Sequence, residues 1–123
     1  MNLSGTGNLT LRVRASGTDA ATGYEGNNIR MIYNSTTITG QSETGGGSTS
    51  LLLGELETVQ NWGFFVDVSN PFNAIKTSFV WNASSAGYFY SGAKWHNTQA
   101  SYTGFTIFGT SMGGTISVYG YNK

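Results

Sequence analysis

Two-residue alternation of apolar and polar side chains recurs along this chain and limits what it can fold into. In "NLTLRVRA" (8–15), Leu9, Leu11 and Val13 share one face, and the polar residues share the other. No long window keeps apolar residues at the three-and-four spacing of a helix, and glycine, threonine and β-branched residues interrupt every candidate. The alternation therefore predicts strands throughout.

Three further segments show the same period. Their alternating faces are Ile29, Met31 and Tyr33 against Arg30 and Ile32; Trp62, Phe64, Val66 and Val68 against Phe65 and Asp67; and Ile75, Thr77, Phe79 and Trp81 against Lys76, Ser78 and Val80. Short runs follow at "GYFYSG", "AKWHN", "GFTIFG" and "GTISVYGY". We expect Ile116 and Val118 to face one side of a closing strand that ends inside the sheet.

Turn clusters separate these segments: "SGTDAATG", "TGQSETGGGSTS", "SNPFN", "NASSAG", "SYTG" and "GTSMGG". The single candidate for a helical turn, "TSLLLGELETVQNW", is weakened by Gly54. The pattern predicts an all-β fold with little or no helix, namely an antiparallel β-sandwich of jelly-roll type with eight or nine short strands. The glycine-rich tract is expected to be a mobile surface loop, with an interdomain linker as the alternative.

Residues 1–123 are expected to form one domain. Charged residues make up 10% of the chain, against about 25% in ordinary soluble domains. Six basic residues balance six acidic ones without a basic stripe, so nucleic-acid binding is not expected. No apolar run is long enough to span a bilayer, and the absence of cysteine excludes disulfides and thiol chemistry.

Residues suited to catalysis or metal binding are few. His96, the only histidine, has no nucleophile elbow to serve, and a surface or loop position is expected for it. Glu55 and Glu57 would point the same way on a strand, but a cation site needs more acidic ligands, so solvated edge charges are preferred. We expect no catalytic residues, no metal site and no cofactor.

Aromatic residues offer the better candidate site. Tyr88, Tyr90, Trp95, His96 and Tyr102 fall within a short span, and sugar rings stack on Trp and Tyr faces while amides and hydroxyls bind their polar edges. The alternative is that they belong to the core of the sandwich. Arg12 and Arg14 share one strand face and are candidates for contact with an acidic glycan or a neighbouring subunit; the alternative is an ordinary outward polar face.

Three segments together with the neutral Gly/Ser-rich surface resemble a jelly-roll module of tailed-bacteriophage structural proteins. They are "LTLRVRASGTDAATGYEG" (9–26), "FFVDVSNPFNAIKTSFVW" (64–81) and "SYTGFTIFGTSMGGTISVYGY" (101–121). Members of that group usually carry strand sequence upstream of the first segment, where this chain has only "MNLSGTG". The resemblance thus implies that the chain lacks an upstream strand or domain, or that another chain covers that edge.

The resemblance implies a non-enzymatic module on the virion surface, in a tail fibre, a tailspike or a head decoration. Its expected partners are other virion subunits, with a homo-oligomer guessed to be a trimer, and a host-surface glycan met by the loops "TGQSETGGGSTS" and "NASSAGYFYSGAKWHN". Neither nucleic acid nor membrane insertion is expected. The alternative is a monomeric carbohydrate-binding module of a secreted enzyme; a hydrolase is the third and least favoured class.

Overall fold

The described part of the chain folds into β-strands joined by turns and irregular connections. The computed structural model describes the backbone of residues 2–84 and 87–120, and the side chains of 8–42, 48–54, 63–84, 87–109 and 113–120. Within these residues there is no helix, and so none that is long and apolar enough to cross a membrane. The described chain forms eight strands: β1 (Asn2–Ala15), β2 (Thr18–Asp19), β3 (Tyr24–Ile32), β4 (Ile38–Ser48), β5 (Leu51–Ser69), β6 (Lys76–Ser84), β7 (Tyr88–Gln99) and β8 (Gly104–Thr115).

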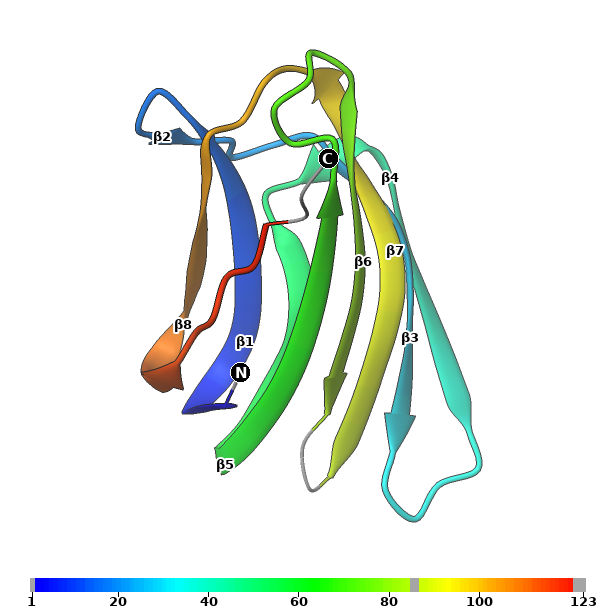
Figure 1. The fold of residues 1–123 in the computed structure, drawn as a ribbon. Coiled ribbons are helices and arrows are strands. Elements are labelled where there is room, and N and C mark those ends of the chain that lie inside the picture. The colour runs from blue at the N-terminus through cyan, green and yellow to red at the C-terminus, as the bar shows by residue number, and fades with distance from the viewer. Residues whose placement is uncertain (1, 85–86, 121–123) are drawn as a thin grey trace.

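The strands pack as two antiparallel layers, so the expected β-sandwich is confirmed (Figure 1). Their hydrogen-bonded order is β2-β1-β5-β6-β7-β3-β4, and β8 pairs with β1. β5 belongs to both layers, because its residues 51–63 pair with β1 and its residues 63–69 pair with β6. One layer is therefore β8, β1 and the first part of β5, and the other is the last part of β5 with β6, β7, β3 and β4. The jelly-roll subtype stays a prediction.

The strands begin and end where the sequence supplies turn residues. Ser16 and Gly17 both adopt positive φ, at 51° and 81°, between the paired residues Ala15 and Thr18. This is the backbone of a two-residue hairpin turn whose twist suits the flanking strands. Asn70 also has a positive φ, of 60°, at the start of the predicted "SNPFN" turn, and asparagine tolerates that conformation better than most residues.

The core lies between the layers and follows the predicted alternation in β1 and β6. Leu9, Leu11 and Val13 are buried, and so are Phe79 and Trp81. The indole Nε1–H of Trp81 donates a hydrogen bond of 3.2 Å to the Leu53 carbonyl of β5, which ties the layers together. Further core residues are Tyr24, Leu51, Phe64, Ala83, Tyr90 and Tyr102.

The two segments expected as binding loops are mostly strands. Residues 38–48, which include most of "TGQSETGGGSTS", form β4 and pair with β3. The segment "NASSAGYFYSGAKWHN" supplies the end of β6 and most of β7, and its residues 85–86 lie outside the described residues. The loop prediction was wrong because small and hydroxylated side chains do not prevent pairing when a neighbouring strand supplies the hydrogen bonds.

The expected closing strand is also shorter than predicted. β8 ends at Thr115, and residues 116–120, here called the C-terminal segment, belong to no strand. Ile116 and Val118 are 43% and 69% exposed, so they do not form the inner face of a closing strand. Figure 1 shows this segment, in red, running from the end of β8 across the front of the sandwich toward β5. The alternation in the sequence was correct, but the described structure supplies no neighbouring strand for it.

We expect Gly92→Ala to destabilise the fold, because a Cβ at this position would lie 2.6 Å from Cζ2 of Trp81 and 2.8 Å from the Asn27 carbonyl oxygen. Overpacking of a fixed ring costs about 1 to 3 kcal/mol of unfolding free energy. The matched control is Gly40→Ala in β4, where a Cβ would meet nothing within 4 Å. Urea unfolding followed by tryptophan fluorescence measures both variants, and equal effects would contradict the packing of Trp81 against Gly92.

Candidate functional site

The two layers separate on one side of the sandwich and leave a groove there. In the described part of the chain, β8 pairs only with β1, and residues 64–69 of β5 pair only with β6. A cavity of about 1010 Å³ lies between these two strand edges. We call this cavity the groove and residues 64–69 the β5 edge.

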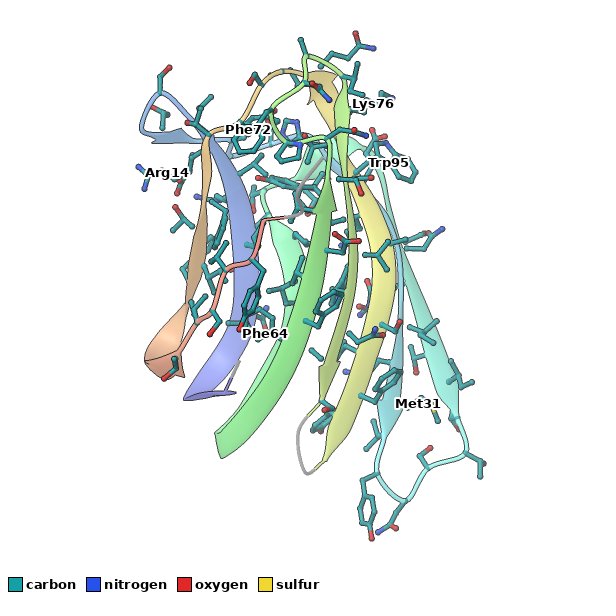
Figure 2. The ribbon with its side chains drawn as sticks, in the orientation of Figure 1. Arg14, Met31, Phe64, Phe72, Lys76 and Trp95 are labelled. Carbon is teal, nitrogen blue, oxygen red and sulfur yellow. The ribbon has the colours of Figure 1, made fainter. Side chains whose placement is uncertain are left out.

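The groove is built from the inner faces of both layers. β1 contributes Leu11 and Val13, the β5 edge contributes Val66 and Val68, and β8 contributes Phe105 with Ile107. Figure 2 shows Phe64 projecting from β5 into this space, with Phe72 above it in the β5–β6 connection. Asp67 is the only charged residue among the described residues that line the groove. The walls are therefore apolar and nearly neutral.

The C-terminal segment lies across the mouth of the groove and contributes part of its lining. Its apolar and aromatic side chains are nevertheless turned largely to solvent, since Val118 is 69% and Tyr119 is 87% exposed. Exposed apolar groups beside a large apolar cavity leave favourable burial unrealised.

The five residues predicted as an aromatic binding surface do not share one surface. Tyr90, His96 and Tyr102 are 1%, 3% and 4% exposed, so their side chains are in the core and cannot stack on a sugar from outside. Trp95 faces the opposite side of β7, is 39% exposed and donates a hydrogen bond of 3.0 Å from Nε1 to the Glu25 carboxylate. Tyr88 is half-buried and stacks with Tyr90 at a centroid distance of 6.4 Å.

His96 has a structural environment instead of the expected surface or loop position. Its Nε2 lies 2.7 Å from the Thr22 carbonyl oxygen and, because a carbonyl only accepts, carries the ring proton. Nδ1 accepts from the Tyr102 hydroxyl at 2.8 Å and from the Thr98 N–H at 3.3 Å. The rings of Tyr24 and Tyr102 contact the imidazole edge-on. Both ring nitrogens are thus used to join the β3 entry, β7 and the β7–β8 connection.

Tyr24 bridges the two layers. Its hydroxyl accepts from the Val13 N–H of β1 at 2.9 Å and donates to the Ala20 carbonyl at 3.0 Å. Burial raises the pKa of Tyr24 from 10.0 to about 12, because the phenolate would lose its hydration there. Burial also raises the pKa of Tyr102. These hydroxyls are held in their neutral form by the fold.

The two arginines predicted as a contact strip make contacts within the chain. Arg14 forms an ion pair with Asp19 at 3.0 Å and donates to the Gly17 carbonyl in the hairpin turn. Arg12 donates from Nε to the Thr49 carbonyl at 2.8 Å, and its guanidinium lies 4.9 Å from the centre of the Phe108 ring. Both side chains are half-buried. These contacts connect β1 to the turn that follows it, to β2, to the β4–β5 connection and to β8.

A second, smaller hollow lies in the layer that contains β6, β7 and β3, where β7 begins and β3 ends. It measures about 440 Å³ and is lined in part by Tyr88 and Phe89 of β7 and by Tyr33 of the β3–β4 connection. Asn34, Ser35 and Ser84 supply polar groups beside these rings. Tyr33 is 72% exposed. Of the predicted aromatic residues, Tyr88 alone lines this hollow, and Tyr33 was not predicted, because nothing in the sequence marks it as close to Tyr88.

The structure does not test the prediction that Glu55 and Glu57 are solvated charges and not metal ligands. In the described residues, no three His, Asp or Glu side chains are grouped so that they could hold a metal ion. The side chains of Glu55 and Glu57 lie outside the described part.

In the comparisons with known proteins, no family model, no curated protein and no solved structure matches this chain.

We expect the protein to lose stability as the pH rises from about 10 to about 12, because Tyr24 ionises more readily in the unfolded chain than in the fold. The stabilisation is complete below the unfolded pKa and falls by about 2 to 3 kcal/mol as the pH passes through the folded one. Urea unfolding across this range, compared with Tyr24→Phe, measures the effect.

Tyr24→Phe should lower stability at neutral pH, through loss of the bridge to Val13 and Ala20, but should flatten the alkaline decline. Tyr33→Phe, at an exposed position, is the matched control and should leave the decline as it is. An unchanged alkaline decline in Tyr24→Phe would show that another group is responsible.

Proposed function

We propose that this chain is a non-enzymatic structural module of a bacteriophage particle, displayed on the virion surface in a tail fibre, tailspike or head decoration, and that it works by associating with other subunits. The resemblance of residues 9–26, 64–81 and 101–121 to jelly-roll modules of tailed phages supports the assignment to a particle. The observation that carries the association is the groove, which has apolar walls and is bordered by two strand edges that pair with no described residue.

Unpaired strand edges beside apolar surface favour association. An exposed edge presents backbone N–H and C=O groups that can pair with another chain, and natural proteins usually cover or charge such edges. Here the β5 edge and β8 border an apolar cavity instead. Because only 10% of the residues are charged, bringing two such surfaces together removes few charges from water.

The assignment to a non-enzymatic class is supported by how the polar groups are used. The only histidine has both ring nitrogens bound within the fold. Tyr24 and Tyr102, whose hydroxyls are buried, hold structural hydrogen bonds and have raised pKa values. A general base must reach a substrate proton, and His96 is 3% exposed.

The solution mass tests the proposed association. We expect static light scattering of the purified chain to give a multiple of 13.1 kDa, with three copies as the expected number from the phage resemblance. The mass should be insensitive to salt, because few contacts between such surfaces are Coulombic. A mass of 13.1 kDa at all concentrations tested would contradict assembly through this module.

The second candidate function, a carbohydrate-binding module of a secreted enzyme, is favoured by the hollow beside Tyr33 and Tyr88. Aromatic faces next to amide and hydroxyl groups are what a sugar ring needs for stacking and hydrogen bonding. In this function the protein would bind as a monomer. The hollow lies away from the groove and shares no described lining residue with it.

A glycan array decides whether the hollow binds sugar. If it does, Tyr33→Ala should weaken binding by about tenfold or more, because the exposed ring would be the stacking platform. Trp95→Ala is the matched control, since Trp95 does not line the hollow, and it should leave affinity unchanged. Saturable binding that is lost in Trp95→Ala and kept in Tyr33→Ala would assign the site to the outer face of β7 instead.

A further inference from the structure

We propose that the C-terminal segment of one copy adds as a strand to the β5 edge of a second copy and fills its groove. This inference rests on the proposed function, because it names the surface through which the module would associate. The occupant is residues 116–120 of an identical chain.

The β5 edge has the geometry that strand addition requires. β1 pairs with one edge of β5 up to Gly63, which lies opposite Asn2, and no described residue pairs with the same edge of β5 along residues 64–69. Residues 64–69 are extended and paired with β6 on their other side, so their backbone is already held in strand conformation. An incoming segment finds a rigid template, which lowers the entropy lost on pairing.

The groove beside this edge has the chemistry of the segment that would enter it. Its walls include Val66, Val68 and Phe79, and Asp67 is its one charged residue in the described lining. The C-terminal segment, "ISVYG", carries no charge and alternates Ile116 and Val118 with Ser117 and Tyr119. An added strand would place Ile116 and Val118 on the core side and Ser117 with Tyr119 on the other.

The position of the segment within its own chain argues for a second copy as the acceptor. The segment already lies at the mouth of its own groove, yet Val118 stays 69% and Tyr119 87% exposed there. In the described chain it belongs to no strand, so its own groove does not provide it with a ladder. If the segment entered the groove of a second copy, its apolar side chains Ile116 and Val118 would be buried there, and the β5 edge of that copy would be paired.

Exchange of this kind also closes an assembly. Each copy carries one donor segment and one acceptor edge, so two copies can exchange reciprocally, or several can pass the segment from each copy to the next in a ring. A ring of three would give the trimer expected for a phage module. In either arrangement no free β5 edge is left, which removes the hazard that an open edge presents.

Engineered disulfides provide the decisive experiment, because the chain has no cysteine of its own. Val66 and Val118 are the central residues for the test, since each lies near the middle of its segment and would be close to the other whichever direction the added strand runs. Paired strands lie about 4.8 Å apart, within the range of Cα separations that a disulfide accepts. The variant is Val66→Cys with Val118→Cys, oxidised at the concentration where light scattering shows the oligomer.

Non-reducing gels should show covalent dimers or higher species that disappear on reduction. A cross-linked monomer would overturn the proposal, because it would place the segment in its own groove, and so would the absence of any cross-link. Val80→Cys with Val118→Cys is the matched control: Val80 is 53% exposed on β6, does not line the groove, and should give no cross-link. Circular dichroism of each variant confirms that it is folded.

A chain ending at Thr115 gives an independent measurement and keeps the two proposals separable. We expect it to be a monomer by light scattering, with the groove open. If it remains an oligomer of the original mass, strand exchange is wrong and the proposed association stands on another surface. If the full chain is itself a monomer, the association is wrong. Should truncation unfold the chain, Val118→Asp, which puts a charge into the apolar groove, is expected to give the same loss of oligomer.

Discussion

The sharing of β5 between two layers is the constraint on which the rest of this structure depends. A strand has two hydrogen-bonding edges, and β5 uses one for β1 along residues 51–63 and the other for β6 along residues 63–69. The layers are therefore continuous through one chain segment, and Trp81 holds them together across the core by its bond to Leu53. Beyond Gly63, no described residue pairs with the β5 edge on the side opposite β6. This edge borders the groove.

The polar groups buried in the core add to this joint. The bridge from Tyr24 to Val13 and Ala20, and the bonds from His96 to Thr22 and Tyr102, connect segments distant in sequence. A buried hydrogen bond contributes modestly to stability, but leaving its donor or acceptor unpaired is costly. These groups therefore fix which strands meet. Their use in the fold is also why the side chains of Tyr24, His96 and Tyr102 are buried.

The sequence predicted the fold class and the inner faces of β1 and β6, because in those strands the polar and apolar faces differ clearly. It could not orient β7, whose outer face carries Phe89 and Trp95 while its inner face carries Lys94 and His96. Lys94 is buried with its ammonium 5.8 Å from the centre of the Trp81 ring, and such a cation–π contact depends on a residue from another strand. Alternation shows which residues share a face, but only the packing of the layers shows which face is inside.

The C-terminal segment shows the same limit of prediction from sequence alternation. Alternation in "TISVYGY" favours a strand, and the segment has strand-like composition, but a strand exists only when a neighbour completes its ladder. Among the described residues, no strand pairs with residues 116–120, and none pairs with the β5 edge on the side opposite β6. Both unmet requirements are for a neighbouring strand, and both segments border the same apolar cavity. The proposed exchange pairs them with each other. The described chain places the segment at the cavity without burying it, and the proposed exchange between copies would meet both requirements.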